Sequence, residues 1–224
     1  MSEDVKPRRR YDSRRRQAQA AQTRADVLAA AHDLFLQRGY AGTTLTAVAR
    51  AAGVVVETIY RGFGSKAGLF KAVVEAAVAG GADRAQIPVE QRSAVRAVID
   101  ETDPGRQLDR YTATQPAIHT RIGPLMRVLT GAAASDAELA GVQQEMEDFR
   151  LAGLGRFAAL LADRGALRPD LSVNHARDII WTLCSHATYD QLVNQRGWTP
   201  QQYQTWLAAT LRHTLLPPGH HPGV

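Results

Sequence analysis

The sequence contains a single cysteine, Cys184, and no long apolar run. One cysteine cannot form an intrachain disulfide, so we expect a protein of the reducing cytoplasm. No apolar stretch reaches the roughly 18 residues that a membrane helix requires. The charged N-terminus lacks the apolar segment of a secretory signal. These absences argue against a membrane-spanning or secreted protein.

The spacings of common catalytic and metal sites are also absent. None of the seven histidines stands in an HExxH or other zinc spacing with a carboxylate. There is no GxSxG motif, no glycine-rich phosphate loop after a strand, and no cysteine pair. Cys184 has no partner motif of a nucleophile, which favours an inert core thiol. We therefore expect no enzymatic activity, no cofactor and no metal.

What the chain has in abundance is apolar residues, which make up 45% of its 224 residues. Alanine and leucine dominate, and both are strong helix formers. No strand pattern or internal repeat is visible. The length suffices for one large or two small domains. The composition predicts an all-α fold of about nine to ten helices.

Positive charge is concentrated in the N-terminal third. Residues 1–66 carry 12 Lys/Arg and 6 Asp/Glu, a balance of +6, whereas residues 67–224 carry 15 and 16, a balance of −1. This asymmetry favours a polyanion partner at one end of the chain. Residues 1–20 contain two arginine triplets and read as a basic, disordered arm whose C-terminal part can extend the first helix. The arm either solubilises the protein or contacts DNA phosphates or a minor groove, and the sequence leaves both interpretations open.

Residues 21–80 read as a small helical domain. The residues Thr23 to Asp26 have the form of a capping box, which predicts the start of a helix there. Gly39 is expected to end that helix. Thr44 is a good N-cap for a second helix, Gly53 makes a sharp turn, and a short helix covers about 55–62. Ser65 caps the next helix. Two short helices joined by a tight turn, here at about 44–63, are the layout of a helix-turn-helix, whose second helix lies in the DNA major groove.

Residues 81–224 read as a larger apolar helical domain, and Gly80-Gly81 with the polar stretch to Gln91 form the boundary. We expect helices over about 90–101, 106–115, 124–133, 135–164, 173–195 and 200–216, with a short piece reaching about residue 121. Pro116 ends one of them. The sequence Ser135 to Glu138 predicts one capping box, and Thr199 with Gln202 predicts another.

The residues between Gly39 and Lys66 resemble the helix-turn-helix signature of the tetracycline-repressor (TetR) family. The matching residues are Gly39-Tyr40, Thr43-Thr44, Val48-Ala49, Ala52-Gly53-Val54, Thr58-Ile59-Tyr60, Phe63 and Ser65-Lys66. A looser similarity, over 196–207, is to the last helix junction of such regulators. The resemblance implies a homodimeric all-helical transcription regulator, usually a repressor. It would bind a palindromic DNA operator and a small effector.

Residues at the ends and exposed face of the short helices are the candidates for DNA contact. Arg61 can form two hydrogen bonds with a guanine edge, and a valine can contact a thymine methyl group. The N–H groups at the start of the first short helix attract a phosphate. A cation in the first turn of the following helix indicates an anion nearby. The candidates are Thr44, Thr46, Val55, Val56, Thr58, Tyr60, Arg61 and Lys66.

Alternatives remain for several of these candidates. Tyr60 can be a core tyrosine, the valines can be buried against the first helix, and Arg61 and Lys66 can be solvated surface charges. Three departures from the family pattern also matter. Val55 replaces a usual serine cap, Glu57 replaces Gly or Pro, and Arg61-Gly62 replaces a pair that is commonly aromatic or histidine.

The larger domain is expected to bind the effector and to dimerise. Apolar and polar candidates for an adaptable pocket are Tyr111, His119, Met126, Met146, Phe149, Phe157, Trp181 and Cys184, which favour a small lipophilic or aromatic effector. Wide apolar stripes on the last two helices predict a dimer interface of Ile180, Leu183, Tyr189, Leu192, Tyr203, Trp206, Leu207 and Leu211. The alternative is that these stripes pack only within one chain. A closed, fully packed larger domain would favour an architectural DNA-binding protein without an effector.

Overall fold

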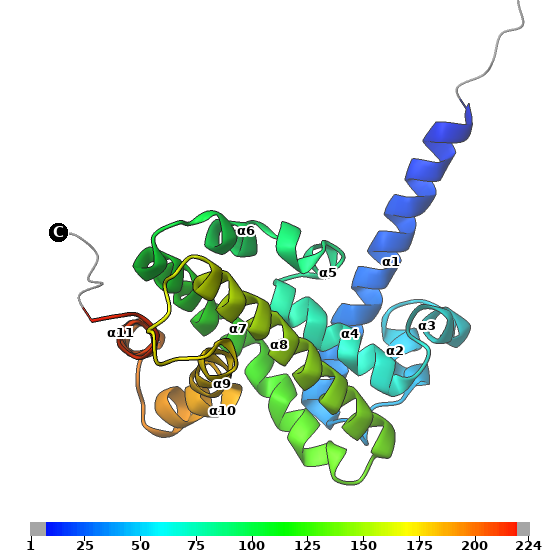
Figure 1. Cartoon of the computed structure of the whole chain (residues 1–224). Coiled ribbons are helices and arrows are strands. Elements are labelled where there is room, and N and C mark those ends of the chain that lie inside the picture. Colours follow the sequence, from blue (N-terminus) through cyan, green and yellow to red (C-terminus); the bar gives the residue numbers. More distant parts are fainter. Residues whose placement is uncertain (1–7, 219–224) are drawn as a thin grey trace, which may run out of the picture. The chain divides into compact units, whose positions relative to one another are not determined.

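The computed structural model describes residues 8–218, with side chains from residue 15, and within that range it contains only helices (Figure 1). The elements are α1 (Arg8–Arg38), α2 (Leu45–Ala51), α3 (Val56–Phe63), α4 (Lys66–Ala79), α5 (Ala82–Ala85), the 3-10 turn η1 (Val89–Gln91), α6 (Ser93–Asp100), α7 (Pro104–Ala133), α8 (Ala137–Asp163), α9 (Val173–Leu183), α10 (His186–Tyr189), the π-helical segment η2 (Asp190–Gln195) and α11 (Pro200–Leu215). The expected all-α fold is confirmed. No helix in this range is both long and apolar enough to span a bilayer.

The chain divides into two compact units, one ending at Gln86 and the other beginning at Ile87. The boundary expected from the sequence was Gly80-Gly81 with the polar stretch to Gln91, and the division lies within that stretch. It falls after the two glycines because α5, which follows them, packs against α1 and α4 of the first unit. Residues 219–224 lie outside the described range.

The first unit is assembled around three aromatic rings. The Phe35 ring of α1 lies 5.0 Å from the Phe70 ring of α4 and 5.9 Å from the Tyr40 ring, between ring centroids. Gly39 (φ 69°) ends α1 and Gly53 (φ 67°) makes the turn after α2, both in the left-handed region that favours glycine. These positions agree with the sequence prediction because a short-range rule determines each of them.

The cap predicted at Thr23 is wrong, whereas the expected extension of the first helix into the basic arm is confirmed. Helix α1 begins at Arg8 and passes through Thr23 without interruption. The Thr23 hydroxyl donates to the Gln19 carbonyl at 2.9 Å, a bond inside the helix in place of an N-terminal cap. Residues 8–20 of the expected arm are therefore helical, and residues 1–7 lie outside the described range.

In the second unit, α7 is a single helix of 30 residues that contains both Pro116 and Pro124. The sequence predicted three separate pieces there. Proline removes one helical hydrogen bond but does not end a helix that is held by packing on both sides. Here α7 packs against α6, α8, α10 and α11, and the Thr120 hydroxyl donates to the Pro116 carbonyl at 2.9 Å.

The helix caps of the second unit differ from the prediction at two places. The N-cap of α8 is Asp136, which accepts from the Leu139 N–H at 2.9 Å, whereas Ser135 was expected. The single helix expected over 173–195 is interrupted at Cys184, and Ser185 caps α10. The capping box at Thr199 and Gln202 is confirmed, with both reciprocal hydrogen bonds present.

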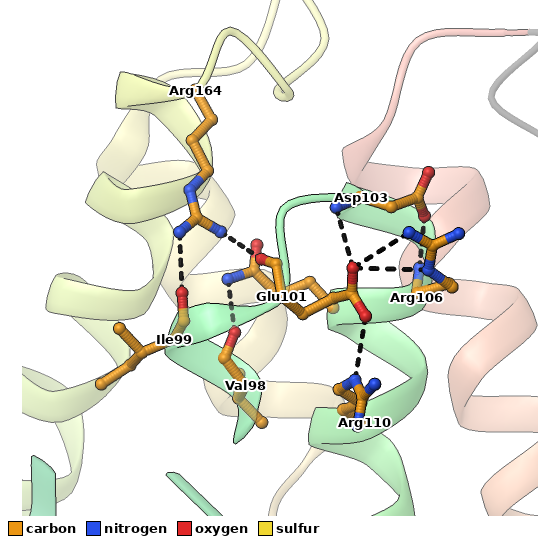
Figure 2. Close-up of polar contacts among 8 residues, drawn as sticks. Val98, Ile99, Glu101, Asp103, Arg106, Arg110 and Arg164 are labelled. Carbon is orange, nitrogen blue, oxygen red and sulfur yellow. Dashed lines mark hydrogen bonds and ion pairs between the residues drawn. The ribbon is translucent and has the colours of Figure 1, made fainter. Parts of the chain in front are cut away.

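A network around Glu101 connects the turn between α6 and α7 to the end of α8 (Figure 2). The Glu101 carboxylate accepts from Arg106, from Arg110 at 3.0 Å, and from the backbone N–H of Asp103. These hydrogen bonds lower the pKa of Glu101 to about 2, with Arg106 the largest contributor. Arg164, at the C-cap of α8, donates to the carbonyls of Ile99 and Glu101.

Candidate functional site

Helix α3 presents one buried face and one solvent-exposed face. Ile59 is fully buried, and Arg61 follows it by about 200° around the helix, on the opposite side. Tyr60 is 55% exposed, which excludes a core position for its ring. Val56 is half-buried, in partial agreement with the alternative that it packs within the domain. The outward face of α3 therefore consists mainly of Glu57, Tyr60 and Arg61.

The N-terminus of α3 has no side-chain cap. Val55 occupies the N-cap position, makes no capping hydrogen bond and is 65% exposed. The half-buried Thr58 donates its backbone N–H to the Val55 carbonyl at 3.0 Å. The start of α3 thus offers backbone N–H groups and an exposed apolar side chain next to the outward face.

Helix α2 begins as the sequence predicted, with Thr44 as its N-cap. The Thr44 hydroxyl oxygen accepts from the Ala47 N–H at 3.1 Å, which leaves the hydroxyl proton available to donate. Thr44 and Thr46 are both exposed. This helix end has the donors that a phosphate requires.

Lys66 has an explanation that the sequence did not reveal. Its ammonium group lies 4.2 Å from the centre of the Tyr40 ring, and the side chain is half-buried. A ring face attracts a cation. The lysine in the first turn of α4 is thus accounted for within the domain, and it no longer requires an anion nearby.

A groove of about 490 Å³ runs between α1 and α3. Its residues were not among the sequence candidates, apart from two on α3. They are Arg16, Gln19, Ala20, Thr23, Arg24, Val27, Thr58, Arg61, Gly62 and Phe63, none of them acidic. The Arg24 guanidinium lies 4.5 Å from the centre of the Phe63 ring and donates to the Gly62 carbonyl at 3.4 Å. Arg16, Gln19, Thr23 and Val27 are spaced as one helix face. This face was not recognised from the sequence because a helix start was expected at Thr23.

In the second unit, His119 is the most unusual of the effector candidates. It is 4% exposed, and neither ring nitrogen has a hydrogen-bond partner. Its ring stacks on Tyr189 at 4.9 Å and lies 6.0 Å from Tyr203 and 5.9 Å from His186, between centroids. The Nδ1 atom of His186 is also buried without a partner. Buried nitrogens without a hydrogen-bond partner are rare and destabilising, so the surroundings of His119 and His186 call for a functional explanation.

Burial is the main cause that lowers the pKa of His119 to about 3, and the positive fields of His186 and Arg150 add to it. The Cys184 carbonyl favours the protonated ring slightly, although its geometry does not meet that of a regular hydrogen bond. The imidazole is therefore neutral near pH 7. It keeps one donor and one acceptor nitrogen.

The structure brings four of the eight effector candidates together. The Tyr111 ring lies 4.8 Å from Phe157, and its hydroxyl interacts with the Cys184 thiol. Burial raises the pKa of Cys184 to about 12, in agreement with an inert thiol. His119 adjoins this group through Tyr203 and Cys184. We refer to Tyr111, His119, Phe157, Cys184, His186, Tyr189 and Tyr203 as the aromatic core.

Two of the effector candidates are exposed and do not lie in the core of the second unit. Phe149 is 61% exposed, and Trp181 is 38% exposed, with its indole N–H donating to Glu147 at 3.1 Å. The sequence suggested both as apolar pocket candidates, without showing whether their side chains are covered. Met126 and Met146 are half-buried and lie outside the hydrophobic cluster.

Most of the predicted dimer interface lies in the interior of one chain. Five of the eight residues are at most 3% exposed, so they cannot contact a second copy: Ile180, Tyr189, Tyr203, Leu207 and Leu211. They form the core between α9, α10 and α11, as the alternative interpretation held. Leu183, Leu192 and Trp206 are half-buried and pack against that core.

Comparison with known proteins relates the chain to bacterial transcriptional regulators, and the family model matches part of the first unit. Residues 27–73 match the family model described as bacterial regulatory proteins, tetR family. The transcriptional repressor BepR of Brucella suis is 26% identical over 215 residues, covering 93% of this chain and 99% of BepR.

Two solved structures share the fold. NalD of Pseudomonas aeruginosa, the secondary repressor of the MexAB-OprM multidrug efflux pump, has a TM-score of 0.66 at 24% identity, covering 88% of this chain and 97% of NalD. The regulator FadR of Bacillus subtilis, solved with stearoyl-CoA, has a TM-score of 0.63 at 16% identity, covering 83% and 96%.

Proposed function

We propose that the chain is a homodimeric repressor of the TetR family of bacterial transcriptional regulators, which a small effector releases from its operator. The observation that supports this most directly is the α2–α3 arrangement. A buried Ile59 fixes one side of α3, and an uncovered polar side lies opposite. Such a helix can enter a major groove without losing its packing.

The assignment of roles on α3 follows from the chemistry of each side chain. Arg61 is the candidate for guanine, since its guanidinium can donate two parallel hydrogen bonds to one base edge. Glu57, one turn earlier, can accept from a cytosine amino group. Tyr60 and Thr44 supply hydroxyl donors for phosphates. Val55 supplies an apolar contact for a thymine methyl group.

We expect Arg61→Ala to weaken binding to the selected operator by about 1–3 kcal/mol and to relax one base position. The operator is first obtained by selection from a random duplex pool with the wild-type protein. Affinities of the wild type and the variant are then measured on the operator and on random DNA. Arg196→Ala, an exposed arginine of the second unit, is the control and should bind as the wild type does. An equal loss on operator and random DNA would contradict a base-reading role for Arg61.

The aromatic core is the candidate effector site. Its rings lie in contact, so an effector has to displace some of them. The unpartnered nitrogens of His119 and His186 give such a ligand polar atoms to satisfy. A flat, largely apolar molecule with a hydroxyl or carbonyl group fits these partners best. FadR, of the same fold, was solved with stearoyl-CoA, and BepR and NalD are repressors.

A palindromic operator follows from the proposed dimer. Two identical reading heads related by a two-fold axis contact half-sites of the same sequence. Selection from the random pool should therefore yield an inverted repeat. A single asymmetric site bound by one chain would rule out the dimer.

A further inference from the structure

The N-terminal half of α1 extends beyond the rest of the first unit (Figure 1). Residues 15–22 are all exposed, and the first buried residue of α1 is Val27. A helix of 31 residues is about 46 Å long. Isolated helical turns without an apolar face to bury are marginal in water. The segment exposes Arg15 and Arg16, which suits a negatively charged ligand.

One stripe of this helix leads directly to α3. Arg16, Gln19, Thr23 and Val27 are spaced at three and four residues, which places them on one helix face. Val27 is buried at one end of the stripe, and Arg16 is exposed at the other end. The groove described above lies between this stripe and residues Thr58 to Phe63 of α3. It thus adjoins the face of α3 proposed to read bases.

The polar groups of this groove favour an anion. All three charged residues that line it are arginines, and a guanidinium has five N–H donors and no acceptor. Arg24 uses one donor on the Gly62 carbonyl and retains others for a ligand. The Gln19 amide adds two donors. A site rich in donors and free of lining carboxylates is suited to a phosphate.

We propose that the groove between α1 and α3 binds the phosphate backbone of the DNA that flanks the bases read by α3. Arg16 contacts one phosphate, and Arg24 contacts a phosphate closer to α3 while it holds the end of that helix. The inference rests on the proposed DNA-binding function and extends it to a second contact surface. Such contacts fix register and add affinity, but they carry no base sequence.

The experiment compares two duplexes and two proteins. One duplex contains only the selected operator, and the other carries about ten further base pairs on each side. The proteins are the wild type and Arg16→Gln, a change that removes the charge in an exposed part of α1 and retains a good helix former. Arg16 is chosen over Arg24 because loss of Arg24 would also disturb α3.

We expect the wild type to bind the extended duplex more tightly than the short one, whatever the sequence of the flanks. Arg16→Gln should lose this gain and still bind the short duplex as the wild type does. On the extended duplex, the slope of log affinity against log salt should fall in magnitude by about 0.9 for each phosphate that the variant no longer neutralises. Arg16→Lys should restore much of the slope. Arg196→Gln, an exposed arginine in the second unit, should keep the wild-type slope.

Two results would overturn the proposal while leaving DNA binding intact. One is a wild-type affinity independent of the flanks, with Arg16→Gln showing the wild-type slope. The other is a gain that depends on the flanking sequence and disappears in the variant, which would indicate base reading in place of phosphate contact. If instead the wild type selects no duplex at all, the proposed function itself fails.

Discussion

At the scale of single residues, His119 combines deep burial with two unpartnered nitrogens. A buried donor or acceptor left unpaired costs about 1–3 kcal/mol. A phenyl ring can keep the stacking on Tyr189 and removes both nitrogens. His119→Phe is therefore expected to leave the second unit as stable as the wild type at neutral pH, or more stable, while it weakens release from the operator by a polar effector.

The same residue predicts an acid sensitivity. Because the folded-state pKa of His119 is about 3, below its ordinary value of 6.5, its contribution to stability is complete above about pH 6.5. That contribution is lost progressively as the pH falls from 6.5 toward 3. His186, whose pKa burial also lowers, adds to the effect, and Glu101 acts only below its ordinary value of 4.5.

Denaturant unfolding followed by tryptophan fluorescence measures this directly, since all three tryptophans lie in the second unit. Between pH 6.5 and 4.5, the unfolding free energy should fall less steeply for His119→Phe than for the wild type. His213, which is exposed, provides the control variant His213→Phe, with the wild-type slope. Identical slopes for all three proteins would contradict the burial of a neutral His119.

At the scale of elements, α3 lacks the side-chain cap that α2 and α4 have. Val55→Ser would supply a side-chain oxygen that accepts from the Thr58 N–H, which in the wild type donates to the Val55 carbonyl. Such a cap contributes about 1 kcal/mol. We expect slower hydrogen exchange of the α3 amides and a higher melting temperature of the first unit. Val55→Ala removes the same exposed side chain without adding an acceptor. Equal exchange rates in the Ser and Ala variants would show that the end of α3 is already satisfied.

Elements set by short-range rules could be predicted from the sequence. The caps at Thr44, Ser65 and Thr199 and the glycines at 39 and 53 each depend on a few neighbours. The continuous α1 and α7 could not be predicted in this way. In α7, packing on several helices outweighs the cost of Pro116, and in α1, a threonine suited to capping bonds inside the helix.

At the scale of the whole molecule, the second unit shows most clearly what the spacing of apolar residues cannot predict. An apolar stripe such as that of Tyr203, Leu207 and Leu211 indicates which side chains are covered, but not what covers them. The structure covers them with the same chain. Conversely, Trp181 was expected to line an effector pocket, and it is 38% exposed. The all-helical fold and the two short helices joined by a turn could be predicted from the sequence, whereas the elements that cover each apolar stripe could not.

Because most of the predicted interface residues are buried within one chain, a second copy is expected to bind to other side chains. Trp181 is 38% exposed on α9, and we expect it to contact the partner in the proposed homodimer. Trp181→Lys retains an N–H donor for Glu147 and should lower the dimer fraction at micromolar concentration in sedimentation equilibrium. Leu36→Lys, which changes an equally exposed apolar side chain in the first unit, should leave it unchanged. A dimer as stable in Trp181→Lys as in the wild type would move the interface elsewhere.

The Glu101 network has a mechanical consequence. Helices α7 and α8 are joined by the short turn after Ala133, and at the other end of α8 Arg164 donates to the carbonyls of Ile99 in α6 and Glu101 in the turn before α7. Because α7 and α8 are connected at both ends, they cannot separate at one end, and any separation between them has to come from bending in their middle. The two prolines of α7 lie in that stretch, where the ladder of backbone hydrogen bonds is already interrupted. A molecule entering beside His119 would thus meet the most compliant part of the pair.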